Sequence, residues 1–263
     1  MPTPLEILFD PISITVLVLY AALMGWEALA PARKLPQVTW WKTKGLLAFT
    51  ANFFVASYLP LFWDQHLASW QLFDLTSYGL VMGTLIGFVV FELVLYAWHR
   101  TMHNSNTLWR GFHQMHHSAE RLDAFGAFWM SPMDMIGFAF IGSLALALIV
   151  GVPPQAATNI LLITVFLAIF QHMNVKTPHW LGFVIERPES HNVHHARGLH
   201  AFNYCDLPLI DMAFGTLRNP HAFEHETGFY DGASSRVLDM MAFQDVSEPK
   251  TVSTSLPGVR QNT

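Results

Sequence analysis

Nine of the fourteen histidines fall into four short clusters, and this grouping is the feature of the sequence that most directly indicates chemistry. The clusters are His99/His103, His113/His116/His117, His172 and His191/His194/His195. Imidazole is the commonest neutral ligand for transition metals. Nine imidazoles are more than a single ion can bind, so the sequence predicts a centre with two metal ions.

The spacing within the clusters favours metal ligands over ordinary surface histidines. His99 and His103 stand four residues apart, which places both side chains on one face of a helix. Segment 113–117 (HQMHH) presents three imidazoles from little more than one helical turn, and segment 191–195 (HNVHH) repeats the pattern. One HxxxH motif occurs by chance in helices, whereas two HxxHH motifs together with an HxxxH motif are a specific signal.

The composition indicates a membrane-embedded chain. Of 263 residues, 52% are hydrophobic and only 13% are charged, compared with about 25% charged residues in an ordinary soluble domain. The net charge of −5 and the lack of a Lys/Arg-rich run argue against a nucleic-acid partner. The single cysteine, Cys205, excludes an intrachain disulfide and a cysteine-based zinc or iron–sulfur site.

Apolar stretches of membrane-spanning length follow one another along the chain, each needing about 20 residues to cross a bilayer. The expected spans are Ile12–Ala30, Gly45–Trp63, Gly79–Trp98, about Asp134–Val152 and about Ala156–Gln171, the last two joined by a turn at residues 151–154. The last pair has a second interpretation as a re-entrant or interfacial hairpin. The first span lacks a basic segment before it and a cleavage site, so we expect a retained anchor.

We expect the histidines to face the cytoplasm. With five crossings, the loops after the first, third and fifth spans share one side, and all four histidine clusters belong to that side. All fourteen lysines and arginines lie there as well, whereas the loop from Asp64 to Asp74 and the turn at residues 153–154 contain none. Because cytoplasmic loops carry the excess of positive charge, the C-terminus is expected in the cytoplasm and the N-terminus on the opposite side.

The expected fold is therefore an all-α integral membrane protein, in which four to five transmembrane or re-entrant helices carry a cytoplasmic helical cap with a histidine-rich two-metal site. No linker or internal repeat divides the chain, so residues 1–230 are expected to form one membrane-embedded domain with a catalytic core at about 92–220. Residues 231–263 are polar and aperiodic towards their end, which is typical of a flexible tail.

From about Glu92 to Pro220 the sequence resembles the sterol desaturase and fatty acid hydroxylase superfamily. Besides the histidine clusters, the resemblance includes segments 170–174 (FQHMN), 186–190 (ERPES), 203–204 (NY) and 211–216 (DMAFGT). It implies a membrane enzyme that binds two iron ions (Fe2+/Fe3+) through histidines and uses dioxygen (O2) to hydroxylate or desaturate lipids. The iron ligands that it implies are His99, His103, His113, His116, His117, His172, His191, His194 and His195.

The residues themselves agree with this chemistry. An all-imidazole set without an Asp/Glu–x–x–His pattern differs from the carboxylate di-iron bundle, and neutral ligands leave a metal pair electrophilic and suited to bind oxygen. The chain has no flavin or nicotinamide fingerprint and no ferredoxin-like cysteine set. A separate electron donor, either a reductase, a ferredoxin or a cytochrome, is therefore expected beside a lipid substrate taken from the bilayer.

Other polar and aromatic residues have two interpretations each. Glu92, inside the third span, is expected to bond a ligand histidine or to pair between helices. Candidates for orienting ligand imidazoles, or else for capping helices or bridging an arginine, are Asp123, Glu189, Asp206 and Asp211.

The remaining histidines are expected outside the site: His66, His179, His200, His221 and His225. His179 or His200, or Asn174 through a water, is nevertheless open as a tenth ligand. Phe125, Phe128 and Trp129 either line a lipid channel or belong to an interfacial aromatic belt.

The leading hypothesis is a lipid oxygenase, with hydroxylation favoured over desaturation. A transition-metal transporter would also gather histidines, but it needs polar ligands near the bilayer midplane and usually repeated halves; only Glu27 and Glu92 are charged within the spans. A haem-binding electron-transfer subunit needs axial histidines on facing helices, and three histidines in one turn do not suit that role.

Overall fold

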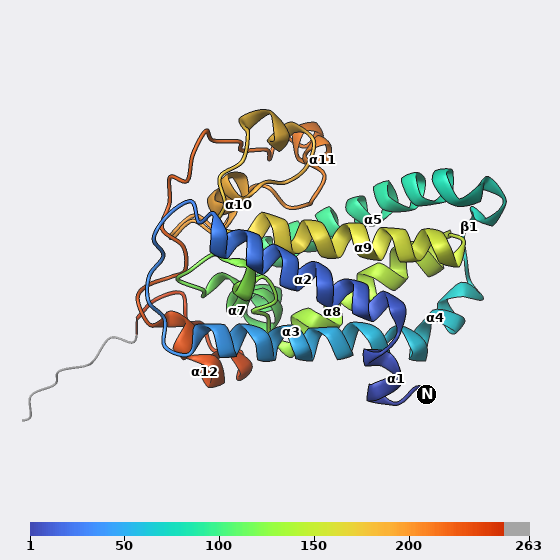
Figure 1. Cartoon of the computed structure of the whole chain (residues 1–263), viewed down its shortest axis with the longest axis horizontal. Helices are drawn as coiled ribbons and strands as arrows, with labels where there is room; N and C mark the ends of the chain where they lie inside the picture. Colours follow the sequence, from blue (N-terminus) through green and yellow to red (C-terminus); the bar gives the residue numbers. More distant parts are fainter. Residues whose placement is uncertain (250–263) are drawn as a thin grey trace, which may run out of the picture.

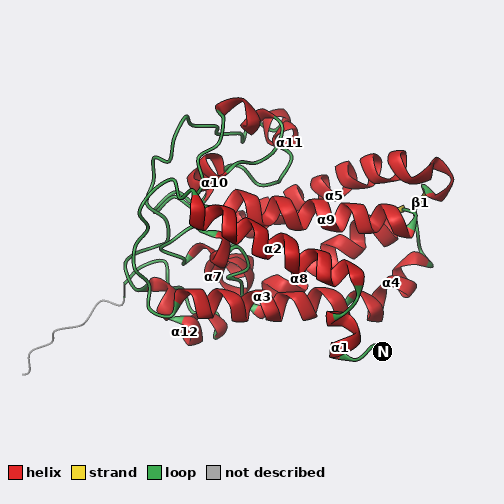
Figure 2. Cartoon of the chain, in the orientation of Figure 1, coloured by secondary structure: helices red, strands yellow, loops and turns green. Residues whose placement is uncertain are grey.

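A computed structural model describes residues 1–249 and shows a mostly helical chain with almost no strands (Figures 1 and 2). Within these residues, five helical segments are long and apolar enough to cross a membrane. They are Pro11–Leu29, Trp41–Ala68, Thr76–Asn104, Pro132–Ile149 and Pro154–His172. The expectation of an all-α fold with four to five transmembrane or re-entrant helices is therefore confirmed, with five helices of spanning length.

Most spans begin at a capping residue or a proline. Asp10 Oδ1 accepts a hydrogen bond from the Ile12 amide at the start of α2, and Pro60 separates the two helices of the second span, since proline suits a first helical position. The short α1 (Pro4–Leu8) precedes the first span. The elements of the spans are α2 (Pro11–Leu29), α3 (Trp41–Tyr58), α4 (Pro60–Ala68), η1 (Thr76–Tyr78), α5 (Gly79–Asn104), α8 (Pro132–Ser143), the π-helical η4 (Leu144–Ile149) and α9 (Pro154–His172).

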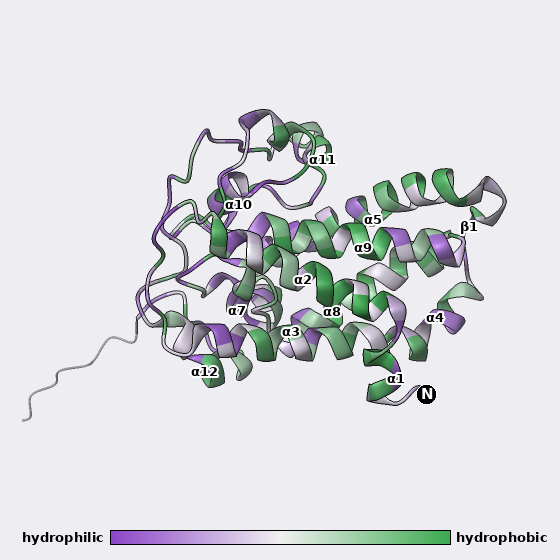
Figure 3. Ribbon diagram, viewed as in Figure 1, coloured by the Kyte–Doolittle hydropathy of each residue, from purple (hydrophilic) through white to green (hydrophobic). Residues whose placement is uncertain are grey.

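The loop at residues 64–74 and the turn at residues 151–154 were both expected on the side opposite the histidines. They meet at one end of the helix bundle. There β1 (Phe73–Asp74) pairs in parallel with β2 (Val150–Gly151). The N-terminal α1 lies towards the same end, whereas α7, α10 and α12 lie at the other end (Figure 1). Polar residues gather in the loops around α7, α10 and α12, while the long helices are mainly hydrophobic (Figure 3).

The cap at the polar end consists of short helices and loops from the second half of the chain and from the segment between α5 and α8. Its elements are α6 (Asn106–Leu108), the π-helical η2 (Trp109–His113), α7 (Gln114–His117), η3 (Ala124–Gly126), η5 (His179–Phe183), α10 (Pro188–His194), α11 (Pro208–Ala213), η6 (Ala233–Ser235) and α12 (Val237–Met241).

Two glycines allow α3 to pack directly against η3. A Cβ atom on Gly45 would lie 2.1 Å from the Phe125 carbonyl oxygen, and one on Gly126 would lie 2.6 Å from the Trp41 ring. Trp41 Nε1 also donates a hydrogen bond of 2.8 Å to Asp123 Oδ1. These contacts fix the segment after α7 against the end of the bundle.

The expectation of a flexible tail from residue 231 is wrong for residues 231–249. Ala233 and Val246 are fully buried, and Met240 is 1% exposed. The Gln114 side chain donates to the Gln244 carbonyl oxygen and accepts from the Val246 amide. A few apolar residues within a polar segment are enough to anchor it, which its average composition did not reveal. Residues 250–263 lie outside the described residues.

Candidate metal centre

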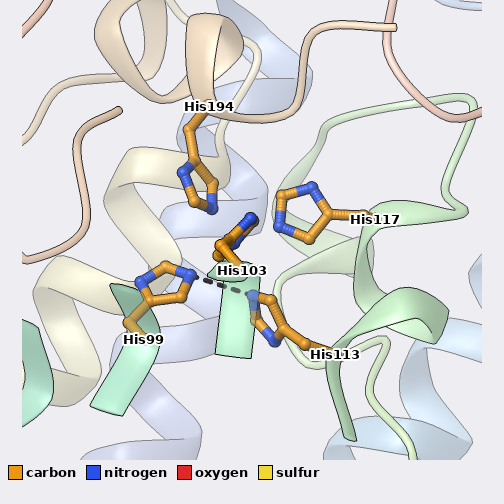
Figure 4. Close-up of side chains that lie close together, drawn as sticks. All are labelled: His99, His103, His113, His117 and His194. Carbon is orange, nitrogen blue, oxygen red and sulfur yellow. Dashed lines mark hydrogen bonds between the residues drawn. The ribbon is translucent and has the colours of Figure 1, made fainter. Parts of the chain in front are cut away.

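The structure brings all nine predicted histidines together in two neighbouring groups. The first group is His99, His103, His113, His117 and His194, and the second is His116, His172, His191 and His195. Within each group, one ring nitrogen from every histidine lies within 4.8 Å of the others. In the first group the five side chains point towards a common centre from α5, η2, α7 and α10 (Figure 4).

Each HxxHH motif supplies both groups. Adjacent side chains on a helix point about 100° apart because a turn takes 3.6 residues. His116 therefore joins the second group while His117 joins the first, and His194 joins the first group while His195 joins the second. The adjacent pairs His116/His117 and His194/His195 therefore each contribute one side chain to each group.

We call the ring nitrogen that faces the other histidines of its group the inner nitrogen. The inner nitrogens lie at separations that suit ligands of a shared ion. His99 Nε2 is 2.9 Å from His113 Nε2, the pair joined by the dashed line in Figure 4. In the second group, His172 Nε2 is 3.0 Å from His116 Nε2 and 3.1 Å from His191 Nε2. Two nitrogens at right angles on one ion, each bound at about 2.1 Å, are about 3 Å apart.

Several other inner nitrogens are buried and have no hydrogen-bond partner in the part of the chain that the structure describes. They are Nε2 of His103, His117 and His194 and both ring nitrogens of His195. Burying a polar atom without a partner is unfavourable by about 1–3 kcal/mol. Because each of these histidines contributes one ring nitrogen to its group, the donor set fits one metal ion in each group.

The second ring nitrogen of each histidine, the outer nitrogen, faces away from its group. Most outer nitrogens form hydrogen bonds with backbone carbonyl groups. In five histidines Nδ1 donates to a carbonyl oxygen of another residue. The pairs are His99 with Tyr204 (2.8 Å), His103 with His200 (2.8 Å), His116 with Trp129 (3.3 Å), His172 with Ala168 (2.6 Å) and His194 with Phe202 (2.7 Å). A carbonyl oxygen only accepts, so Nδ1 carries the hydrogen in each case. The opposite nitrogen, Nε2, is therefore left with a free lone pair for a metal.

Two carboxylates approach outer nitrogens. Asp134 Oδ2 lies 2.8 Å from His113 Nδ1, and Glu186 Oε1 lies 3.9 Å from His191 Nδ1. Burial raises the pKa of Glu186 well above its ordinary value. Sequence reasoning missed both residues. Asp134 follows the N-cap Ser131 in the first turn of α8, and its amide donates to Ser131 Oγ, so in the sequence it has the pattern of a capping residue.

Among the described residues, the four acidic residues with two interpretations do not contact the histidines of either group. Their hydrogen-bond partners are Trp41 and Arg121 for Asp123, Thr177 and Arg187 for Glu189, Gln171 for Asp206, and Tyr204, Cys205 and Thr216 for Asp211. The alternative holds for two of them: Asp123 caps η3 through the Gly126 amide and pairs with Arg121, and Glu189 pairs with Arg187. Asp211 instead fixes the loop whose Tyr204 carbonyl accepts from His99.

Among residues 1–249, Glu92 neither bonds a histidine of the two groups nor pairs with a side chain of another helix. Its Oε2 accepts hydrogen bonds from the backbone amides of Asp206 (2.9 Å) and Leu207 (3.1 Å). The side chain is fully buried. Glu92 therefore ties α5 to the loop between α10 and α11, which is the loop that carries the Tyr204 carbonyl.

Of the candidates for a tenth ligand, none belongs to either group. His200 lies closest, with Nδ1 3.1 Å from His117 Nδ1, and burial lowers its pKa to about 4. His179 stacks on His221 at 3.9 Å between ring centroids. The Asn174 side chain donates to the Arg33 carbonyl oxygen. His200 is thus an outer partner of two ligands, which the sequence pattern did not indicate.

Burial also keeps the histidines of the cap neutral. It lowers the pKa well below 6.5 in each cap histidine of the two groups, and the neighbouring imidazoles lower the pKa further. These residues are His113, His116, His117, His191, His194 and His195. A metal binds the neutral imidazole, so the cap presents its ligands in the form that binding requires.

A cavity of about 180 Å³ borders both groups, since His99 and His113 of the first and His116, His172 and His191 of the second line it. It adjoins a cavity of about 530 Å³ that lies between α2, α3, α8 and α9. The two share Asn52, Phe91, Phe128, Phe138, Thr164 and Val165. Phe128 therefore lines the path between the histidines and the space among the spanning helices.

Comparison with known proteins gives one family match and several relatives. The model of the family "Fatty acid hydroxylase" matches residues 84–216, just over half of the chain. The chain is 31% identical to an ornithine lipid hydroxylase of Rhizobium tropici over 140 residues, which is 52% of this chain and 42% of the relative. It is 29% identical to an alkylglycerol monooxygenase of Danio rerio over 164 residues, 60% of this chain and 32% of the relative.

A very-long-chain aldehyde decarbonylase of Oryza sativa is 28% identical over 170 residues, which is 58% of this chain and 25% of the relative. The matched region thus spans less than half the length of each of these relatives. No solved structure gives a significant match.

Proposed function

Because the chain belongs to the fatty acid hydroxylase family, we propose that it is a membrane-bound oxygenase that binds two iron ions and hydroxylates a lipid. Desaturation of the lipid is the alternative outcome. One observation carries the proposal: both histidine groups border the small cavity, and that cavity adjoins an apolar cavity among the spanning helices. A lipid chain can therefore reach the histidines from the bilayer side.

The nine histidines would hold the irons, His99, His103, His113, His117 and His194 one ion and His116, His172, His191 and His195 the other. Bound iron would supply the activation of O2, which side chains alone cannot perform. Imidazole also binds zinc, copper and nickel, so the choice of iron rests on the family.

The overall reaction needs two electrons and two protons from outside. Hydroxylation converts one C–H bond, O2, two electrons and two protons into C–OH and one water. Desaturation removes two hydrogens from the lipid and reduces O2 to two waters with the same input. Since the chain has a single cysteine and no flavin or nicotinamide motif, a separate reductase, ferredoxin or cytochrome would deliver the electrons.

The protein's own groups position the ligands and exclude water. Carbonyl oxygens such as those of Tyr204 and Phe202 hold the imidazoles of His99 and His194 in one tautomer. Phe128 and Phe138 line the small cavity and make its wall apolar next to the histidines. A reacting carbon would thus be enclosed by apolar side chains, which protects it from competing reactions with water.

The proposal is tested by comparing lipid extracts from native-host cells that produce the wild-type chain, His116→Ala or His66→Ala. His66 is exposed and lies at the opposite end of the bundle, so it is the matched control. We expect lipids heavier by one oxygen, or lighter by two hydrogens for desaturation, with the wild type and the control only. Identical extracts from all three strains, with folded protein and with iron and O2 supplied, would overturn the proposal.

Metal analysis separates the competing classes. We expect about two non-haem irons per wild-type chain, as two groups of four or more imidazoles suggest. A Soret absorption band would instead indicate a haem protein. Iron-free protein that changes the metal content of cells without changing their lipids would favour a transporter.

A further inference from the structure

The larger cavity has the shape and lining of a site for one hydrocarbon chain. Along α3 and α4 its wall runs from Phe49 to Asp64, which is about 22 Å at 1.5 Å per helical residue. Most of its lining side chains are apolar, among them Val16, Phe53 and Ile160. Its volume of about 530 Å³ is within the usual range for a small-molecule site.

The smaller cavity, next to the histidines, has a different character. Asp206, Gln171 and Asn203 line it beside the five histidines. Its volume of about 180 Å³ is below the usual 300–1,000 Å³ of a complete ligand site. It therefore has room for one end of a ligand whose remainder lies in the larger cavity, and its polar lining suits the polar end of a lipid.

Asp206 offers a hydrogen-bond acceptor to the smaller cavity. Gln171 Nε2 donates to Asp206 Oδ1, and the other oxygen, Oδ2, accepts no hydrogen bond from the described residues. The Asn203 amide group donates to the carbonyl oxygens of Ser190 and Arg218, so its hydrogens are already used. A carboxylate has capacity for more hydrogen bonds than the one it accepts here. The ligand end that matches Asp206 is therefore a donor.

Charge favours the same conclusion. No lysine or arginine lines the smaller cavity among the described residues. The buried Arg187, at the N-terminus of α10, does not line the cavity and is paired with Glu189 at 3.0 Å. A phosphate or carboxylate end would meet the Asp206 carboxylate without a cationic side chain to pair with, whereas a hydroxyl or amine would donate to it.

We propose, on the basis of the proposed function, that the substrate is a long-chain lipid whose polar end carries a hydroxyl or amine group. Asp206 accepts a hydrogen bond from that end, and the chain extends through the larger cavity away from the histidines. The carbons next to the polar end then lie beside both histidine groups. Oxygen insertion occurs at one of these carbons: its C–H bond, O2, two electrons and two protons become C–OH and water.

The position of the new oxygen tests this directly. Fragmentation mass spectrometry of the product lipid should place the added oxygen on one of the first few carbons next to the polar end. An oxygen in the middle of the chain or near its methyl end would overturn the inference and leave the proposed function standing. No oxygenated or desaturated lipid at all would overturn both.

A variant within the chain cavity tests the path of the tail. Gly142 lines the larger cavity, and the nearest atom to a Cβ placed there is Phe91 Cε2 at 3.9 Å, so a larger side chain has room. Gly142→Leu should lower turnover of the longest chains about tenfold relative to the shortest, since single methylenes in a pocket have effects of that size. Gly25→Leu is the control, because Gly25 is exposed with nothing within 4 Å. Unchanged chain-length preference in Gly142→Leu would contradict the inference.

Photolabelling gives a measurement that does not depend on turnover. Octadecanol with a diazirine at its methyl end should label peptides around Ser57 or Ala147, which line the larger cavity. Excess octadecanol or octadecylamine should compete, whereas octadecanoate and octadecyl phosphate should not. In Asp206→Asn, octadecanol should compete about tenfold less well at unchanged metal content. Labelling beside the histidines, or competition by the anions, would overturn the inference.

Discussion

Asp134 Oδ2 lies 2.8 Å from His113 Nδ1, and both side chains are at most 1% exposed. This is the shortest contact between a carboxylate and a histidine of either group among the described residues. Asp134 lies in the first turn of α8, whereas His113 ends the π-helical η2. The contact therefore couples the orientation of one imidazole to the docking of a spanning helix.

Asp134→Asn should weaken metal binding while the protein still folds. An amide cannot supply the negative charge that raises the basicity of the imidazole, and loss of such an outer partner typically weakens metal binding 10–100-fold. Metal content after dialysis against increasing chelator concentrations measures the change. The control is Glu224→Gln, because Glu224 is exposed in the cap. Equal chelator resistance in Asp134→Asn and wild type would show that the contact does not support a ligand.

The division of adjacent histidines between two groups predicts a particular metal stoichiometry. His194 belongs to the first group and His195 to the second. His194→Ala and His195→Ala should each reduce the content from about two metal ions per chain to about one, because each removes a ligand from one group only. Elemental analysis of the purified proteins measures this. Loss of both ions in each single variant would indicate that the groups bind metal as one unit.

Glu92 should contribute to stability through the loop that it holds. Glu92→Ala leaves the buried amides of Asp206 and Leu207 without an acceptor, which should lower the free energy of unfolding by about 2–4 kcal/mol. Glu92→Gln keeps an amide oxygen as acceptor and should be milder. Thermal unfolding in detergent compares the two variants with wild type. If Glu92→Gln lowers the free energy of unfolding as much as Glu92→Ala, the stabilisation comes from the negative charge of Glu92 and not from the hydrogen bonds.

The spans and the nine histidines could be predicted because their signals are local. Hydropathy over about 20 residues identifies a span, and the HxxHH spacing places imidazoles within one turn. Helix geometry separates the neighbours His116 and His117, but which of the two joins which group could not be predicted, since it depends on where α9 and α10 place the other histidines.

The hydrogen-bond partners of the outer ring nitrogens could not be predicted from the sequence either. Most are backbone carbonyl oxygens, such as those of Tyr204 and Trp129, and a carbonyl is present at every residue. Asp134 resembles a capping residue at the start of a helix. Asp206 and Asp211 had the right residue type, but the loop directs them towards Gln171 and towards backbone amides.

The proposed orientation in the membrane is tested with single introduced cysteines. Cys205 is buried and should react slowly, so the wild type gives a low background. Ser69→Cys lies near the β1 end of the bundle and Glu224→Cys in the cap, and both positions are exposed. A membrane-impermeant maleimide should label Ser69→Cys on intact cells and Glu224→Cys only after permeabilisation. The reverse pattern would place the histidines outside the cytoplasm.

The segment after residue 230 should be required for an intact histidine cap. Val246 is fully buried in the main core, and its amide donates to Gln114 Oε1 at 3.3 Å. Gln114 lies between His113 and His116, so this contact supports the helix that supplies both groups. Val246→Asp would bury a charge without a partner, and we expect it to lower the free energy of unfolding by about 2–4 kcal/mol and to reduce metal retention.

Ser247→Asp is the matched control, because the neighbouring Ser247 is exposed and an added carboxylate there stays in solvent. Thermal unfolding and metal content should therefore be close to wild type in the control. If Val246→Asp behaves like Ser247→Asp in both measurements, the segment is dispensable for the cap. If instead only Val246→Asp loses metal, residues beyond the family match at 84–216 support the centre, because their packing holds the Gln114 helix in place.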